Sequence, residues 1–179
     1  APRCGNGTTG MTLRAVVKGV GHYLPDRIVP NAELEALVQT SDEWIRTRTG
    51  IQSRRVSTPD ESLNDLAVRA GQQALAMAQW EPDSLDLVLL ATSTPDDLFG
   101  SAPRVQAGLK AHNAVAFDLT AACSGFLFAL VTAAQYLRTG AMQRVLVIGA
   151  DQLSRFVDWD DRSTCVLFGD GAGAVALEA

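Results

Sequence analysis

Histidine and cysteine, the side chains that most often bind metals or form covalent bridges, are scarce in this sequence. There are two histidines and three cysteines among 179 residues. Cys4, Cys123 and Cys165 lie far apart, and an odd number without a Cys-x-x-Cys pair indicates neither a zinc site nor a disulfide framework. We therefore expect no metal, and free thiols in a reducing, cytoplasmic compartment.

Clustered positive charge and long apolar runs are lacking as well. The chain has 15 Lys and Arg against 20 Asp and Glu, a net charge of −5. A nucleic-acid surface usually gathers its basic residues on one face, so scattered arginines favour a small anionic ligand instead. The longest apolar run follows Cys123 and is broken by Ser124, Gly125 and Thr132, which leaves it too short to span a bilayer. We expect neither nucleic acid nor a membrane as a partner.

The chain does have the composition of an ordinary globular domain. Hydrophobic residues make up 47% and charged residues 20%, and the length suits one substantial core. Residues 1–10 carry no signal-peptide pattern, and we interpret them as a flexible extension or a remnant of expression. The ordered domain is predicted to cover residues 11–179.

Segments typical of strands alternate with segments typical of helices. Residues 85–93 and 144–151 are nearly continuous apolar runs, as in strands that are covered on both faces. This alternation predicts an α/β fold, with a mixed, mostly buried sheet and helices on both of its faces. The glycines at 169, 171 and 173 predict two short strands around a turn in residues 165–179. Further strands are expected in 13–25 and 114–119, and helices in 32–38, 40–48, 61–80, 101–111 and 122–140.

Helix-capping residues mark several of these boundaries. Thr40 with Glu43, and Ser62 with Asp65, have the three-residue spacing of a capping box. Gly50 suits the end of the helix that Thr40 begins. These signals predict where two of the helices start and where one of them stops.

Cys123 stands where a helix is predicted to begin, directly after a strand and an apolar turn. The first turn of a helix presents unpaired N–H groups and the positive end of its dipole, which favour the reactive thiolate. Gly125 would leave room for a substrate to approach. Unpaired cysteines are also often inert core residues. Position and composition leave both interpretations open.

The helix that follows Cys123 is apolar nearly all round. Residues 126–131 read Phe-Leu-Phe-Ala-Leu-Val and leave no polar stripe. A helix of this kind should be buried between layers of the fold. We therefore predict a central apolar helix that starts near Cys123.

Three motifs together resemble one enzyme family. They are "TSDEWIRTRTGI" at residues 40–51, "AFDLTAACSGF" at 116–126 and "DRSTCVLFGDGAGAV" at 161–175. In this order and spacing they are similar to motifs of β-ketoacyl-acyl carrier protein synthase III, a thiolase-fold condensing enzyme, and the resemblance runs from about residue 11 to the end of the chain. It implies an N-terminal thiolase-like half in which Cys123 takes an acyl group from acetyl-CoA or another short acyl-CoA.

The resemblance also implies roles for residues around this cysteine. The backbone N–H of Cys123 matches one donor of an oxyanion hole. Trp44 and Arg162 match the pair that stacks on the adenine of CoA, while Thr40 and Arg48 match residues at the mouth of the CoA site. Without the resemblance, the simplest interpretation is that Thr40 caps its helix and Trp44 packs against its neighbours. The two arginines would then be solvated charges on the surface. Acyl-CoA enters as a substrate, and no cofactor is implied.

Phe99 matches an aromatic residue that lines the acyl pocket of the partner subunit across a homodimer interface. The alternative is a loop aromatic that is buried within its own subunit. His22 and His112 do not fall at the family's catalytic histidine motif. We interpret both histidines as surface or turn residues.

The resemblance leaves one part of the family's chemistry outside this chain. In the family, a His and an Asn of the second half drive the decarboxylation of malonyl-acyl carrier protein, and this chain has only about half of the expected length. The intact protein is expected to condense the acyl group on Cys123 with malonyl-acyl carrier protein, which starts fatty-acid synthesis. Two alternatives stay open: a non-catalytic thiolase-like half that dimerises or binds a partner, and a related acyltransferase of secondary metabolism.

Overall fold

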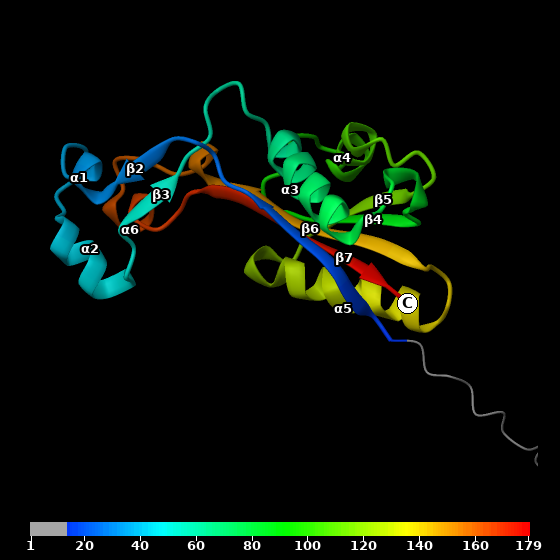
Figure 1. Cartoon of the computed structure of the whole chain (residues 1–179). Helices are drawn as coiled ribbons and strands as arrows, with labels where there is room; N and C mark the ends of the chain where they lie inside the picture. Colours follow the sequence, from blue (N-terminus) through cyan, green and yellow to red (C-terminus); the bar gives the residue numbers. More distant parts are fainter. Residues whose placement is uncertain (1–13) are drawn as a thin grey trace, which may run out of the picture.

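The computed structural model describes residues 14–179, and the predictions for residues 1–13 lie outside this range. Its centre is a five-stranded sheet in the order β1-β7-β6-β4-β5. β4 runs parallel to β5 and β6, whereas β7 runs antiparallel to both of its neighbours (Figure 1). The predicted mixed sheet is confirmed. The strands are β1 (Val16–Tyr23), β4 (Leu87–Ala91), β5 (Val115–Leu119), β6 (Arg144–Gln152) and β7 (Asp170–Glu178).

Helices cover both faces of the sheet, as predicted. α3 (Leu63–Ala78) and α4 (Ala102–Leu109) pack on one face, and α5 (Gly125–Arg138) packs on the other (Figure 1). All five residues of β4 are buried, because their side chains alternate between two separate cores. This double burial explains why the sequence of β4 is one continuous apolar run.

A smaller lobe extends from one end of the sheet (Figure 1). It has its own apolar cluster, to which Leu34, Ile45 and Cys165 contribute. The buried Arg54 guanidinium stabilises the lobe by donating hydrogen bonds to the Val29 and Val166 carbonyls and to Asn31. The elements of the lobe are β2 (Ile28–Pro30), β3 (Ser53–Arg55), α1 (Asn31–Leu34), α2 (Asp42–Thr49) and α6 (Arg162–Cys165).

The capping predictions are confirmed for α3 and wrong for the start of α2. Ser62 and Asp65 exchange both hydrogen bonds of a capping box, and Gly50 ends α2 with a φ of 75°. The N-cap of α2 is Ser41, whose hydroxyl accepts the Trp44 N–H at 3.1 Å. Thr40 lies one residue outside the helix and does not cap it. The capping-box spacing was therefore out of register by one residue.

The prediction of two short strands around a glycine turn in residues 165–179 is wrong. Residues 170–178 form one continuous strand that pairs on both sides, and α6 ends at Cys165. Gly169 and Gly171 allow close packing instead of forming a turn, whereas Gly173 has no described atom within 4 Å of a Cβ position. A Cβ at Gly169 would lie 2.7 Å from the Arg55 carbonyl, and one at Gly171 would lie 2.9 Å from Leu24.

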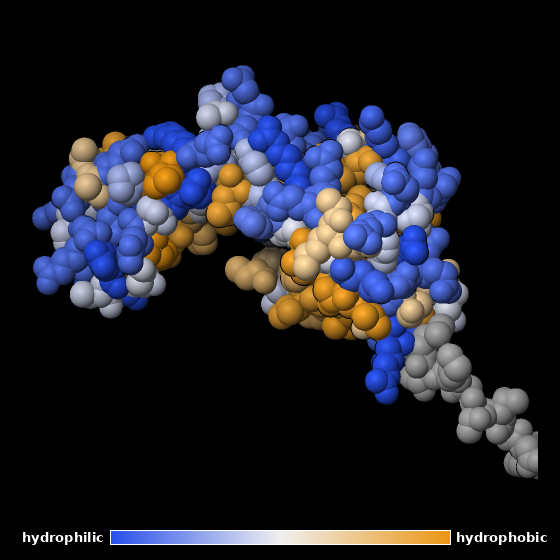
Figure 2. All heavy atoms as spheres, viewed as in Figure 1, coloured by the Kyte–Doolittle hydropathy of each residue, from blue (hydrophilic) through white to orange (hydrophobic). Residues whose placement is uncertain are grey.

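The prediction that the helix after Cys123 is buried between two layers is also wrong for this chain. The sheet covers one side of α5, where Ala129, Ala133 and Leu137 are fully buried. On the opposite side, Leu127 and Phe128 are 65% and 54% exposed. Apolar residues gather over α5 on the surface seen in Figure 2. The reason is that the described residues supply only one layer against this helix.

Candidate functional site

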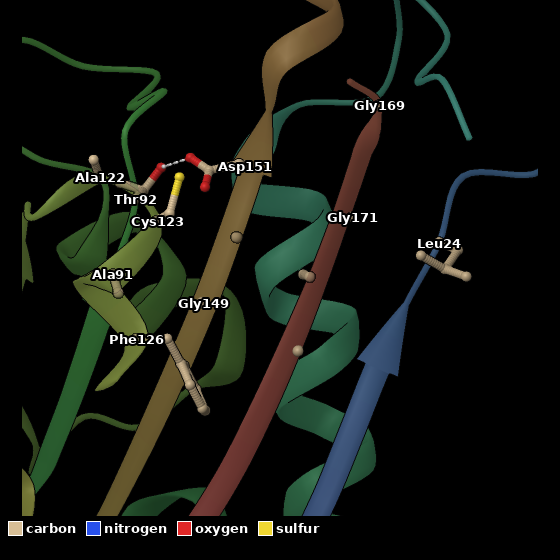
Figure 3. Close-up of a pocket in the computed structure, with 13 residues that line it drawn as sticks. Leu24, Ala91, Thr92, Ala122, Cys123, Phe126, Gly149, Asp151, Gly169 and Gly171 are labelled. Carbon is tan, nitrogen blue, oxygen red and sulfur yellow. Dashed lines mark hydrogen bonds between the residues drawn. The ribbon is translucent and has the colours of Figure 1, made fainter. Parts of the chain in front are cut away.

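A cavity of about 480 Å³ opens where the parallel strands of the sheet end. Ala91 and Thr92 come from the end of β4, Gly149 to Asp151 from β6, and Cys123 from the turn after β5 (Figure 3). Because parallel strands point the same way, their carboxyl ends meet at one edge, which is where ligands usually bind in α/β sheets. The other lining residues are Leu24, Ala122, Phe126, Gly169, Gly171, Ala172 and Gly173.

Cys123 is exposed in this cavity on a strained turn. It lies in the 3₁₀ helix η2 (Ala122–Ser124), and α5 begins two residues later at Gly125. The preceding residue, Ala122, has a φ of 45°, a left-handed conformation that costs free energy for a residue with a Cβ. The interpretation of Cys123 as a buried core residue is wrong, whereas Cys165 is such a residue. The fold presents the Cys123 thiol to the cavity.

A hydrogen-bond network ties the three strand ends around this thiol. Oδ1 of Asp151, at the end of β6, accepts the Ser93 N–H at 2.7 Å and the Thr92 hydroxyl at 3.4 Å. The Thr92 carbonyl in turn accepts the Thr120 hydroxyl at 3.0 Å, three residues before Cys123. The network therefore links the turn that carries Cys123 to both neighbouring strands.

Sequence reasoning did not single out Asp151 or Thr92. Each of them lies at the end of a nearly continuous apolar strand, Thr92 directly after β4 and Asp151 near the end of β6. That position was the available signal, since polar residues at the carboxyl ends of parallel strands converge at the same edge of the sheet.

The predicted CoA residues lie together on the smaller lobe. The guanidinium carbons of Arg48 and Arg162 are 4.5 Å and 4.7 Å from the centre of the Trp44 ring. Arg162 also donates a hydrogen bond to the Gln39 carbonyl at 3.1 Å. The Thr40 hydroxyl oxygen is buried and has no hydrogen-bond partner among residues 14–179. None of these four predicted residues lines the Cys123 cavity.

Phe99 is on the loop between β4 and α4, and its side chain is 96% exposed. The neighbouring Leu98 is 93% exposed. The Asp118 carboxylate fixes the end of this loop by accepting the backbone N–H groups of Ser101 and Ala102 at 2.8 Å and 2.6 Å. The alternative that Phe99 is buried within its own subunit is wrong for the described chain.

The two histidines are exposed, as predicted for surface or turn residues, and neither is among the residues that line the Cys123 cavity. His22 is on β1, and the His112 ring lies 2.9 Å from the Asp83 carboxylate. The hydrogen bond that the backbone N–H of His112 donates to Asp83 is the main cause that holds the pKa of Asp83 below its ordinary value. The hydrogen bond with the His112 ring is the second cause.

A second hollow, of about 700 Å³, lies between the smaller lobe and the 3₁₀ helix η3 (Leu153–Arg155). Its two arginines are already in ion pairs, Arg27 with Glu33 and Arg155 with Asp96. No cysteine or histidine is among the described residues that line this hollow. Among the described helices, none is both long enough and apolar enough to cross a membrane.

Sequence comparison gives a consistent result. The family 3-oxoacyl-[acyl-carrier-protein] synthase III matches residues 117–179. A protein of Synechococcus sp. (strain WH7803) named beta-ketoacyl-[acyl-carrier-protein] synthase III is 74% identical over 161 residues, which are 90% of this chain and 48% of that protein. A protein of the same name from Prochlorococcus marinus (strain MIT 9313) is 70% identical over the same shares of the two chains.

Solved structures share the fold. The 3-oxoacyl-[acyl-carrier-protein] synthase III of Aquifex aeolicus VF5 superposes with a TM-score of 0.90 at 51% identity, over 92% of this chain and 54% of that one. The priming β-ketosynthase of the R1128 polyketide pathway gives 0.89 at 40% identity, over 97% and 52%. The chain spans about half the length of the curated relatives it matches. In its sequence and in its thiolase-like fold, the chain is similar to proteins of the β-ketoacyl-acyl carrier protein synthase III family.

Proposed function

We propose that the intact protein containing this chain is an acyltransferase that forms a carbon–carbon bond in two steps, both at Cys123. The first substrate is acetyl-CoA or another short acyl-CoA, and the second is malonyl-acyl carrier protein. The observation that carries the proposal is the exposed thiol on a strained turn, at the edge of the sheet where three parallel strands end. The reaction would start fatty-acid synthesis in the cytoplasm.

In the first step, the sulfur of Cys123 attacks the carbonyl carbon of the acyl-CoA thioester. The bond to the CoA sulfur breaks, CoA leaves with the proton of the thiol, and the acyl group remains on Cys123 as a new thioester. Negative charge develops on the carbonyl oxygen during the attack, and the backbone N–H of Cys123 would stabilise it. Acyl transfer and carbon–carbon bond formation thus take place as two easier steps instead of a single difficult one.

The residues on the smaller lobe would bind the nucleotide end of CoA. The flat Trp44 ring and the Arg162 guanidinium both stack readily on an adenine, and Arg48 supplies charge for the phosphates. The unpartnered Thr40 hydroxyl supports a ligand here, because a buried polar group without a partner is costly.

The second step needs groups that lie outside this chain. Loss of CO2 from the malonyl group gives a carbanion, which attacks the acyl carbon and releases Cys123 as a thiolate. We assign the His and Asn that promote this loss to a second half of the protein, with residues 14–179 as its N-terminal half. The exposed apolar side of α5, which includes Leu127 and Phe128, supports a second layer at this place.

We further propose that the intact protein is a homodimer. Leu98 and Phe99 project from the loop between β4 and α4 with almost no cover from their own chain. Exposed neighbouring apolar side chains of this size favour a protein partner. The Phe99 ring would reach the partner subunit and line its acyl pocket.

A condensation assay tests the proposed function. The intact protein with acetyl-CoA and malonyl-acyl carrier protein should release CO2 and form a 3-ketoacyl product, and the Cys123→Ser variant should lose at least ~10³-fold of this activity. Cys165→Ser is the matched control, because that thiol is buried in the smaller lobe. Product formation by Cys123→Ser at the wild-type rate would overturn the proposal.

A second candidate is a condensing enzyme of secondary metabolism, which the 40% identity to the R1128 priming β-ketosynthase supports. The two candidates differ in the carrier protein that accepts the acyl group. Assays with the acyl carrier proteins of fatty-acid and of polyketide synthesis separate them, and we expect the former to be preferred. A reading frame without a second half carrying the His and Asn would instead favour a non-catalytic, partner-binding half.

A further inference from the structure

The loop between β4 and α4, which carries Phe99, is attached to the end of β5 at both of its own ends. At the start of the loop, the Thr92 N–H donates to the Leu119 carbonyl at 3.3 Å, and the Thr92 carbonyl accepts the Thr120 hydroxyl at 3.0 Å. At the far end of the loop, the Asp118 carboxylate accepts two backbone N–H groups. Three consecutive residues of the chain therefore hold the base of this loop.

Asp118 makes the stronger of the two attachments. Its Oδ2 accepts the Ser101 N–H at 2.8 Å, and its Oδ1 accepts the Ala102 N–H at 2.6 Å. Both N–H groups lie at the start of α4, where no preceding turn supplies a carbonyl, and an ionised acceptor forms stronger hydrogen bonds than a neutral one. The Ser101 hydroxyl does not cap α4 and instead accepts the Asp96 N–H at 2.9 Å. The cap of α4 thus comes from β5.

The residue that follows Phe99 is fitted to this carboxylate. Gly100 has a φ of 102°, a backbone conformation that side chains rarely adopt. A Cβ on Gly100 would lie 3.1 Å from the Asp118 carboxyl carbon, so a larger residue would push the loop away from β5. The attachment therefore ends directly beside the aromatic residue.

No packing within the described chain sets the direction of the Phe99 side chain, which is 96% exposed. Its direction depends instead on the hydrogen bonds at the base of the loop. A side chain that is held in place before it meets a partner loses less conformational freedom on insertion. Hydrogen bonds to Asp118 thus prepare the Phe99 ring for a pocket that lies outside the described chain.

The strand that holds the loop also leads to the thiol. Asp118 is the second-last residue of β5, and the chain continues through Thr120 into the turn that carries Cys123. We propose that Asp118 is a positioning residue that fixes where the Phe99 ring points, and thereby limits the length of the acyl chain that the partner subunit's Cys123 accepts. The limit on chain length rests on the proposed function and its homodimer, whereas the attachment of the loop does not.

Hydrogen exchange tests the attachment by itself. Asp118→Asn keeps the size of the side chain but offers one acceptor oxygen to two N–H groups. In the intact protein, this variant should speed the exchange of the backbone N–H groups in residues 98–102 by roughly tenfold, measured by mass spectrometry. Unchanged exchange in this segment would overturn the inference.

Acyl transfer tests the limit on chain length. In each transfer the Cys123 sulfur takes the acyl group and CoA leaves as a thiol, and the mass of the Cys123 peptide reports the rate. Asp118→Asn should raise the rate of transfer from hexanoyl-CoA, relative to that from acetyl-CoA, by roughly tenfold, because a loosely held ring obstructs a long chain less. Gly100→Ala keeps the carboxylate and should shift this ratio in the same direction, so it provides the same test if Asp118→Asn does not fold.

The matched control is Asp83→Asn, which removes a similar acceptor at the other end of β5. Asp83 accepts the His112 N–H at 2.9 Å, three residues before β5 begins. This variant should change neither the exchange in residues 98–102 nor the ratio of hexanoyl to acetyl transfer. A ratio that moves as much in Asp83→Asn as in Asp118→Asn would assign the effect to a general loosening of β5 and contradict a positioning role.

A double variant tests whether Asp118 acts through the ring. Phe99→Ala should itself raise the ratio of hexanoyl to acetyl transfer, and Asp118→Asn added to it should raise the ratio no further. A second increase of full size in the double variant would mean that Asp118 acts independently of Phe99, against the proposal.

These measurements separate a failure of the inference from a failure of the proposed function. If acetyl transfer to Cys123 proceeds and Phe99→Ala raises the ratio but Asp118→Asn does not, the role of Asp118 is wrong and the proposed function stands. If no acyl-CoA acylates Cys123 in the wild-type protein, the proposed function fails and the limit on chain length fails with it. Hydrogen exchange then still decides whether Asp118 holds the loop.

Discussion

On one face of the central sheet, α3 and α4 meet the strands with apolar contacts that are complete within the chain. On the other face, α5 buries one side against the same strands and leaves Leu127 and Phe128 exposed. The exposed Cys123 thiol, the cavity and the Asp151 carboxylate all lie toward the α5 side. We call the α3 side the closed face, because the described chain itself packs against it, and the α5 side the open face, whose exposed groups we propose are covered by a ligand or by further protein.

The largest effect is expected where the closed face is tightest. β1 approaches α3 so closely that a Cβ on Gly21 would lie 2.1 Å from the Ala70 carbonyl oxygen, so Gly21→Ala must push strand and helix apart. We expect a loss of about 3 kcal/mol or more in the free energy of unfolding, measured by urea denaturation. Gly173→Ala is the control, because a Cβ there meets none of the described residues within 4 Å, and we expect it to cost less than ~1 kcal/mol. Equal losses in the free energy of unfolding for Gly21→Ala and Gly173→Ala would show that the closed face is not packed more tightly than the open face.

The second prediction tests whether the open face is covered in the intact protein. If further protein covers α5, Phe128→Ala should cost about 3 kcal/mol in the free energy of unfolding, as for an aromatic residue in a core. Met77→Ala on α3 is the comparison, since Met77 is similarly exposed and its sulfur accepts the Val20 N–H at the edge of the closed face at 3.3 Å. It should cost less than ~1 kcal/mol. A loss for Phe128→Ala no larger than that for Met77→Ala would mean that nothing packs on α5.

The third prediction concerns the stacked side chains of the smaller lobe. Arg162→Ala should weaken CoA binding by roughly tenfold, since a stacked guanidinium contributes about 1 kcal/mol or somewhat more. Binding of acetyl-pantetheine, which lacks the adenine, should be unaffected. Isothermal titration of both ligands measures this difference, with the exposed Arg104→Ala as a control. An equal loss for the two ligands would remove Arg162 from the adenine site.

The smallest effect is expected at the capping box of α3, and it depends on pH. Hydrogen bonds from the Ser62 hydroxyl and N–H lower the pKa of Asp65 below its ordinary value of 3.8. The ionised carboxylate therefore stabilises the folded state above that value, and this contribution is lost as the pH falls through the lower pKa of the folded state. Ser62→Ala should cost about 1 kcal/mol at pH 7 and less at pH 2.

Thermal unfolding at several pH values measures this prediction. Asp65→Asn is the control, because in that background the cost of Ser62→Ala should no longer change with acid pH. A cost of Ser62→Ala that is the same at pH 7 and pH 2 would contradict a charged capping box.

Much of the fold followed from local patterns in the sequence. The buried strands β4 and β6 are continuous apolar runs, and Ser62 with Asp65 marked the start of α3. β7 was mispredicted because glycines that form a turn and glycines that allow close packing look alike in the sequence. Only the distant partners, such as the Arg55 carbonyl next to Gly169, distinguish the two.

The candidate site was predictable in part. The resemblance pointed to Cys123, which the structure places in a cavity, and to Trp44, which lies on the smaller lobe with two arginines stacked on it; their roles remain predictions. Asp151 was not foreseen, because its position beside the thiol depends on three strands that meet only in the folded chain. The exposure of α5 was not foreseen either, since an apolar pattern does not say which layers the chain itself supplies.

The most direct measurement of the central claim is the mass of the Cys123 peptide after the intact protein has been incubated with acetyl-CoA. We expect one added acetyl group on this peptide, none on the peptide that contains Cys165, and none in the Cys123→Ser variant. An unmodified Cys123 peptide, or an acetyl group that persists elsewhere in Cys123→Ser, would contradict it.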